Sequence, residues 1–133
     1  LEKVRAALIL VVEDVHEISD GIERLLKTDG YPVALARDEV EAIQSAQLTR
    51  PDLILVSLTG LSGEVPATAH RIREQAAVED QIPMVFWVED IDEGEEVAIG
   101  RNVYLTCPDS FNQLRGLFAH LLDREILRAH VGK

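Results

Sequence analysis

The sequence predicts a single α/β domain in which five parallel strands form a doubly wound sheet with helices on both faces. Three observations lead to this prediction. Short apolar runs alternate with longer segments of helical periodicity along the 133 residues. The apolar runs are continuous, which is typical of strands covered on both faces. A chain of this length can bury one sizeable core.

The first half of the chain contains two strand–helix units. The run Ala7–Val12 predicts the first strand, and a helix follows the acidic pair Glu13-Asp14 and ends near Asp29-Gly30. Pro32–Ala36 predicts the second strand. Asp38 is expected to cap the next helix, because Glu41 lies three residues on in the capping-box position. The apolar stripe expected on that helix consists of Val40, Ile43, Ala46 and Leu48.

The second half repeats this order. Leu53–Val56 predicts the third strand, Ile82–Val88 the fourth and Asn102–Thr106 the fifth. A helix with Pro66 in its first turn follows the third strand, and Ser110 is expected to cap a last helix. The apolar stripes expected on these two helices consist of Val65, Ala69, Ile72 and Ala76, and of Phe111, Leu114, Leu117, Phe118, Leu121 and Leu122.

Two segments depart from this regular order. Between the fourth and fifth strands we expect a helix over Asp90–Ile99, short or frayed, because residues 89–100 hold six carboxylates and two glycines. At the end of the chain, residues 123–133 extend the last helix beyond a domain of residues 1–122. This extension is either a surplus turn or two or a link to a further domain. The first residue, Leu1, is typical of a piece of a longer polypeptide.

Composition narrows the function classes. With 47% apolar and 28% charged residues the chain reads as a soluble globule. No stretch approaches the ~20 apolar residues of a membrane span, and no signal segment opens the chain, so we expect a cytoplasmic location. The net charge of −11 argues against nucleic-acid binding and favours a basic partner. The single cysteine, Cys107, excludes an internal disulfide and a multi-cysteine zinc site.

The candidate site lies at the carboxyl ends of the predicted strands. In an open α/β sheet, ligands collect beyond those ends. The side chains that the sequence places there are Glu13, Asp14, Ser57, Val88, Glu89, Thr106 and Cys107.

From about Ala6 to Leu122 the chain resembles the receiver domain of bacterial two-component response regulators. The resemblance is carried by "LILVVED", "GYPVALARDEVEAI", "RPDLILVSLTGLSG", "HRIRE", "IPMVFWVE" and "VYLTCP". It implies a flavodoxin-like sheet with strand order 2-1-3-4-5.

The resemblance also implies roles for the strand-end residues. The family's acidic pair, which holds a divalent cation, corresponds to Glu13 and Asp14. The phospho-acceptor aspartate is replaced by Ser57, the hydroxyl residue by Val88 and the lysine by Cys107. Three of the five functional groups are therefore missing, and the resemblance predicts a degenerate pseudo-receiver.

Each replacement weakens phosphoryl chemistry. A serine hydroxyl is a poor nucleophile without an adjacent base, and the Val88 side chain has nothing to donate to a phosphoryl oxygen. Cys107 removes the positive charge of the site, while Glu89 adds a carboxylate. We therefore expect this pocket to repel a phosphoryl group.

Several residues have a second interpretation. Glu13 and Asp14 are either a solvated strand end with a helix cap, or weak ligands of Mg²⁺ or Ca²⁺; we expect no other cofactor. Ser57 is either a neutral replacement or a target of a serine kinase. Cys107 is either a packing residue or a redox sensor, although nearby carboxylates should raise the pKa of its thiol.

The leading hypothesis is a binding module without enzymatic activity that acts through phosphorylation-independent protein contacts. The resemblance implies a partner surface on the fourth helix, the fifth strand and the fifth helix. In this chain these are the segments Asp90–Ile99, Asn102–Thr106 and the outer side of Phe111–Arg128. The long last helix also suggests a homodimer. The acidic run Glu89–Glu96 is either a solvated face or a docking surface for a basic partner. The surface residues expected to contact a partner are Trp87, Ile91, Val97 and Tyr104.

Two alternatives remain open at this point. One is residual phosphorelay with Asp14 or Ser57 as the acceptor. The other is small-molecule binding in the strand-end cleft, although no glycine-rich phosphate loop follows any strand. We assign no chemistry to His16, His70, His120 and His130, which lie on predicted helices at scattered spacing.

Overall fold

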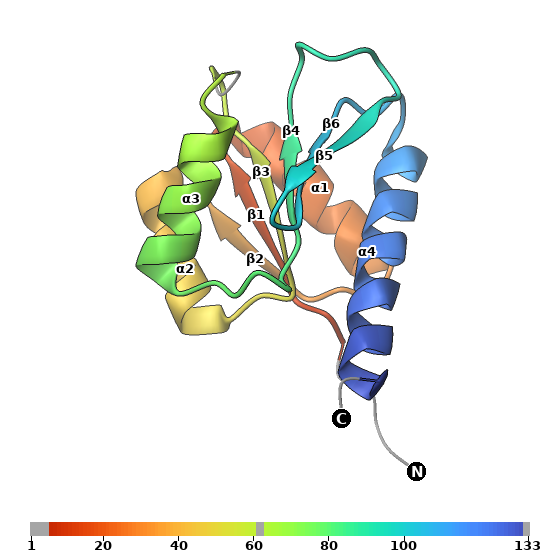
Figure 1. Cartoon of the computed structure of the whole chain (residues 1–133). Helices are drawn as coiled ribbons and strands as arrows, with labels where there is room; N and C mark the ends of the chain where they lie inside the picture. Colours follow the sequence, from red (N-terminus) through yellow and green to blue (C-terminus); the bar gives the residue numbers. More distant parts are fainter. Residues whose placement is uncertain (1–5, 61–62, 132–133) are drawn as a thin grey trace.

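One mixed sheet organises the molecule, with helices on both of its faces (Figure 1). The computed structural model describes residues 6–60 and 63–131, with side chains as far as Asp123. The strands are β1 Ile9–Glu13, β2 Val33–Ala36, β3 Leu53–Ser57, β4 Met84–Trp87, β5 Glu96–Gly100 and β6 Val103–Thr106. The helices are α1 His16–Thr28, α2 Glu39–Thr49, α3 Val65–Ala76 and α4 Phe111–Val131.

The predicted α/β architecture is confirmed, with one strand added. The order is β2-β1-β3-β4-β6-β5. The first five strands in this order are parallel and correspond to the predicted order 2-1-3-4-5, while β5 pairs antiparallel to β6 at the edge. The prediction of five strands was therefore wrong for the described residues, which form six.

The core lies on both faces of the central strands. Residues Ile9–Val12 of β1 and Leu53–Val56 of β3 have no solvent exposure. Alternate residues of these strands pack against α2 and α3 on one face and against α1 and α4 on the other. This two-sided burial explains why the strands are continuous apolar runs.

The prediction of a helix over Asp90–Ile99 was wrong. Residues 96–100 form β5, and the segment before it is a loop. Gly94 and Gly100 adopt φ angles of +90° and +107°, which lie outside the right-handed helical region. Between them, the β-branched Val97 and Ile99 favour a strand.

The β5–β6 hairpin closes through a tight turn at Arg101 and Asn102. These residues have φ angles of +54° and +62°, the left-handed pair that a two-residue hairpin turn requires. The side chain of Asn102 donates to the Gln81 carbonyl at 3.0 Å and accepts from the Tyr104 hydroxyl at 2.7 Å. These bonds of the Asn102 side chain help to hold the turn, in which Arg101 adopts a left-handed conformation that is uncommon for this residue.

Arg73 of α3 joins this hairpin to the rest of the fold. Its side chain is buried and donates to the carbonyls of Glu79, Ile82 and Arg101 at 2.7, 3.1 and 2.7 Å. A longer contact of 3.4 Å reaches the carbonyl of Asn102. One guanidinium thus donates hydrogen bonds to carbonyls in two loops that are far apart in sequence.

The helix faces agree only in part with the predicted stripes. The stripe of α3 is buried as predicted, and that of α4 is buried except for the half-buried Phe111. On α2 the prediction was right for Ala46, which is buried, and for Ile43, which packs half-buried on the core. It was wrong for Val40 and Leu48, which are 64% and 85% exposed, while Ala42 is buried instead. The small side chains of Ala42 and Ala46 let α2 pack closely, and Val40 and Leu48 lie outside the contact.

Helix ends follow their predicted signals. The Asp38 carboxylate accepts from the Glu41 N–H at 2.8 Å, and the Ser110 hydroxyl accepts from the Gln113 N–H at 3.3 Å. The last helix continues past Leu122 to Val131, as predicted. No helix within the described residues combines the length and the hydropathy needed to cross a membrane.

We predict that Arg73→Met lowers the free energy of unfolding by about 3 kcal/mol, because several buried carbonyls lose their donor at once. Urea denaturation measures this change. The matched control is Arg71→Met on the same helix, which removes a partly exposed ion pair with Glu39 and should cost much less. Equal losses in the two variants would contradict the role assigned to Arg73.

Candidate functional site

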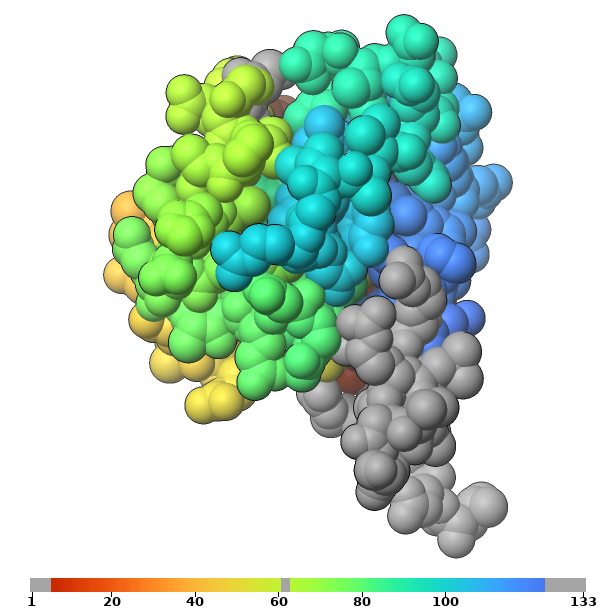
Figure 2. Space-filling view, in the orientation of Figure 1, coloured from red at the N-terminus to blue at the C-terminus, as the bar shows by residue number. Residues whose placement is uncertain are grey.

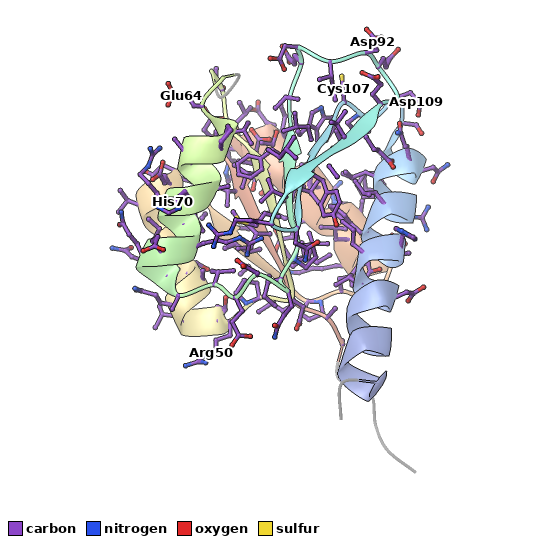
Figure 3. The ribbon with its side chains drawn as sticks, viewed as in Figure 1. Arg50, Glu64, His70, Asp92, Cys107 and Asp109 are labelled. Carbon is purple, nitrogen blue, oxygen red and sulfur yellow. The ribbon has the colours of Figure 1, made fainter. Side chains whose placement is uncertain are left out.

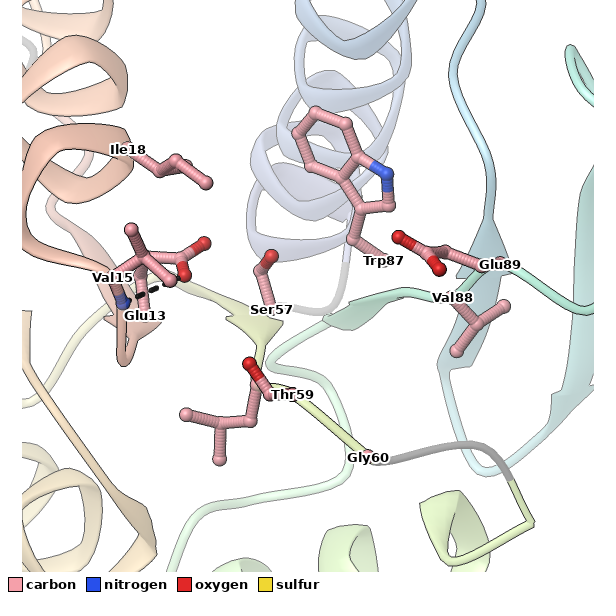
Figure 4. A pocket seen from close by; sticks show the side chains of 10 residues that line it. Glu13, Val15, Ile18, Ser57, Thr59, Gly60, Trp87, Val88 and Glu89 are labelled. Carbon is pink, nitrogen blue, oxygen red and sulfur yellow. Dashed lines mark hydrogen bonds between the residues drawn. The ribbon is translucent and has the colours of Figure 1, made fainter.

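A cavity of about 480 Å³ opens at the carboxyl ends of β1, β3 and β4. Figure 4 shows Ser57 between Glu13 on one side and Trp87 and Glu89 on the other. The residues that line the cavity are Glu13, Val15, Ile18, Ser57, Leu58, Thr59, Gly60, Trp87, Val88 and Glu89. Four of the six residues predicted for the degenerate pocket therefore meet here: Glu13, Ser57, Val88 and Glu89.

The strand register brings these residues together. Glu13 of β1 pairs directly with Ser57 of β3, and Val56 pairs with Phe86 of β4. Because the strands are parallel, their ends meet at one edge of the sheet. Val88 follows β4 and donates its N–H to the Thr106 carbonyl at 2.9 Å, which holds it beside β6.

Glu13 is a buried carboxyl group at the base of the cavity. Its residue is 3% exposed, and its Oε2 accepts from the Val15 N–H at 3.0 Å. Its Oε1 has no hydrogen-bond partner among the described residues. Burial raises the pKa of Glu13, and the neighbouring Ser57 hydroxyl and the Val15 N–H offset this only in part.

Asp14 is exposed and has the opposite pKa shift. Both of its carboxylate oxygens lie 3.3 Å from the Thr59 N–H. Slight desolvation opposes ionisation, but the hydrogen bonds from Thr59 outweigh it and lower the pKa of Asp14. Asp14 therefore ties the end of β1 to the loop after β3.

The described lining of the cavity carries negative charge and no positive side chain. Glu13 and Glu89 are its ionisable groups. Val88 is 3% exposed and presents only methyl groups. The described lining thus combines two carboxyl groups, the hydroxyl of Ser57 and the methyl groups of Val88.

Cys107 does not line this cavity. It is half-buried, and its backbone bonds to the loop before β5: its carbonyl accepts from the Gly94 N–H, and its N–H donates to the Glu95 carbonyl at 3.3 Å. Figure 3 shows it at the end of the sheet where Asp92 and Asp109 lie. The added strand thus ties the backbone of Cys107 to the acidic loop.

The four residues predicted for a partner surface lie on two faces of the sheet. Trp87 and Tyr104 pack against the core under α1 and α4. Ile91 packs against the core under α2 and α3, and Val97 is opposite Leu105, which packs on that same side. All four are half-buried. They do not form a single patch.

The sequence analysis missed three residues of the site, Val15, Ile18 and Thr59. Val15 and Ile18 of the first helix form an apolar rim, and Thr59 holds Asp14 through its backbone. Trp87, predicted to contact a partner, packs on the core and also lines the cavity. The loop position of Thr59 after the third strand was the signal available for it.

Among the described residues, no three His, Cys, Asp or Glu side chains are grouped so that they could hold a metal ion. His16, His70 and His120 are exposed, and His130 lies outside the described side chains.

We predict that Glu13→Gln stabilises the domain at neutral pH. Since the pKa of Glu13 is raised in the folded state, the folded protein binds more protons than the unfolded chain between the usual value of 4.5 and the raised value. Ionisation of Glu13 therefore costs stability as the pH rises through this window. The difference between variant and wild type should vanish below it.

Urea denaturation of both proteins over a series of pH values measures this difference. The matched control is Asp14→Asn, which should lower the free energy of unfolding at neutral pH instead of raising it. The pKa of Asp14 is lowered in the folded state, so its ionisation gives stability that is lost as the pH falls. A stability difference for Glu13→Gln that does not change with pH would contradict the buried-carboxylate explanation.

The chain is similar to known proteins in sequence and in fold. No family model matches the chain. Response regulator MprA of Mycobacterium ulcerans is 31% identical over 122 residues, which are 87% of this chain and 50% of that protein. Transcriptional regulatory protein PrrA of Mycobacterium tuberculosis is 34% identical over 83 residues, which are 61% of this chain and 34% of that protein. The chain thus spans between a third and a half of these curated relatives.

One of the solved structures with a similar fold matches most of this chain. The receiver domain of sensor histidine kinase PA1611 from Pseudomonas aeruginosa, crystallised with a magnesium ion in its active-site cleft, has a TM-score of 0.67 and 25% identity. The match covers 90% of this chain and 99% of that domain. Sequence similarity to the regulators and the shared fold together identify the chain as a receiver domain of the two-component response-regulator type.

Proposed function

We propose that this receiver domain no longer accepts a phosphoryl group and acts through phosphorylation-independent contacts with proteins. One observation carries the proposal: the strand-end cavity persists, but its described lining offers Ser57 and Val88 where phosphoryl transfer needs a carboxylate and a hydroxyl. An acceptor carboxylate is ionised at neutral pH and attacks directly, whereas a serine hydroxyl needs a base.

The carboxylate that is paired with Ser57 in the sheet is poorly suited to serve as that base. Glu13 lies directly opposite Ser57 and its pKa is raised by burial. Its Oε2 already accepts from the Val15 N–H. Moreover, removing the hydroxyl proton would place a third negative group beside Glu13 and Glu89, with no positive side chain in the described lining to stabilise it.

The same residues fit a divalent cation poorly. Mg²⁺ requires a near-octahedral set of oxygen ligands, and the carboxylates of the acidic pair, Glu13 and Asp14, already accept backbone N–H bonds. Among the described residues, Glu13 Oε1 is a buried oxygen without a hydrogen-bond partner. We propose that Mg²⁺ or Ca²⁺ binds weakly and that no phosphoryl step depends on it.

We predict that the wild-type domain gains no mass when it is incubated with Mg²⁺ and acetyl phosphate, because it lacks the acceptor group. Intact mass spectrometry measures this directly. The control is the variant Ser57→Asp, Val88→Thr, Cys107→Lys, which restores the three missing groups and should gain one phosphate in a Mg²⁺-dependent way. Stoichiometric phosphate on the wild type would overturn the proposal.

We also predict that the wild-type domain binds Mg²⁺ with a dissociation constant of about a millimolar or weaker, because too few oxygens are available. Ser57→Asp adds a carboxylate beside Glu13 and should tighten binding, whereas Ser57→Asn adds a side chain of similar size without the charge. Calorimetric titration compares the three proteins. Tight binding by the wild type would show that the ligand set has been underestimated.

A further inference from the structure

The outer edge of β5 is a row of backbone groups that no strand of the described sheet covers. β5 is the terminal strand and pairs only with β6. Four of its five residues are exposed, and Val97 is half-buried. Figure 2 shows the teal atoms of this segment on the surface between α3 and α4. Such an edge is a template for an added strand.

The ladder with β6 fixes which groups are available. The N–H of Cys107 donates to the Glu95 carbonyl, and Glu96, Val97 and Ala98 are opposite Thr106, Leu105 and Tyr104 in order. Because hydrogen-bonded and non-bonded pairs alternate in an antiparallel ladder, Glu96 and Ala98 turn their N–H and C=O groups outward. The irregularity between Ala98 and Gly100 ends this regular stretch.

The segment that contains the edge strand carries only negative charges. Residues 89–100 contain six carboxylates and no Lys, Arg or His, and all six carboxylate residues are exposed. Glu95 accepts from the Asp92 N–H and Glu96 from the Gln113 side chain, so these two are partly engaged. The nearest cation along the chain, Arg101, is paired with Asp80 at 3.1 Å.

The two sides of the edge differ in character. On the α3 side, a hollow of about 150 Å³ lies between α3 and the hairpin. Its lining combines the apolar side chains of Pro66, Ala69, Ile99 and Val103 with the basic side chains of His70, Arg73 and Arg101, so a further cation is disfavoured on this side. On the α4 side lies the Glu96 carboxylate, held at Gln113. A strand added to β5 projects alternate side chains to these two sides, so its best match has apolar residues on one side and cations on the other.

We propose that the β5 edge binds an extended partner segment of alternating basic and apolar residues by strand addition. The inference rests on the proposed function in one respect, that the domain acts by binding a protein. A second copy of this chain is a poorer occupant, since each copy carries a net charge of −11 and the same carboxylates at this edge.

The test uses a capped hexapeptide of alternating lysine and valine, with the glutamate–valine hexapeptide as its charge control. Titration of the ¹⁵N-labelled domain should move the amide signals of residues 96–100 with the lysine peptide only, and binding should weaken with added salt. Ala98→Pro removes one outward N–H on an edge strand, where proline is tolerated. It should weaken binding at least about tenfold, whereas Ala98→Thr, which keeps the N–H, should not.

A second variant keeps the test decisive if Ala98→Pro does not fold. The double variant Asp90→Lys, Glu93→Lys reverses two exposed charges outside the strand and should also weaken the lysine peptide at least about tenfold. Equal binding of both peptides, unchanged binding by the variants, or no shift in β5 would overturn the inference. So would a dimer in sedimentation that Ala98→Pro dissolves, because the occupant would then be a second copy.

This outcome is separate from that of the proposed function. A wild-type domain that gains phosphate but still binds the lysine peptide through β5 contradicts only the proposed function. A domain that stays unphosphorylated and ignores the peptide contradicts only the strand-addition inference.

Discussion

The parallel register between β1 and β3 is the constraint on which the site depends. Both strands are buried on two faces, so a shift by one residue would exchange the helices that each side chain packs against. With the register set, Glu13 and Ser57 meet at the rim, and the loops that carry Asp14 and Thr59 are drawn together. The position of the cavity follows from core packing rather than from any interaction within the cavity itself.

The two carboxylates at the end of β1 differ in burial and in the direction of their pKa shifts. Glu13 is buried, its pKa is raised, and its backbone contact with Val15 also positions the start of α1. Asp14 instead bridges to the loop after β3 through the Thr59 N–H. Both carboxylates therefore have structural contacts of their own. The fold itself therefore uses both carboxylates, whatever chemistry the site performs.

The edge of the sheet is the part that departs most from the expected receiver pattern. A hairpin replaces the helix predicted over Asp90–Ile99, and Arg73 of α3 anchors the hairpin turn from inside. This exchange substitutes an open strand edge for a helical surface. It also ties Cys107 to the acidic loop through two backbone bonds. The contacts available to a protein partner at this edge are therefore backbone groups flanked by carboxylates rather than the face of a helix.

The amino-acid sequence by itself determined the parallel α/β order, most element positions and the identity of the strand-end residues, because apolar runs, capping residues and turn signals act locally. Only the tertiary structure decided that residues 96–100 form a strand, that Ala42 rather than Val40 faces the core, and that Trp87 reaches the cavity while Cys107 does not line it. The physical reason is that these outcomes depend on long-range partners. β5 exists through its pairing with β6 and through carbonyl bonds from Arg73, a residue that lies 28 positions from Arg101 in the sequence.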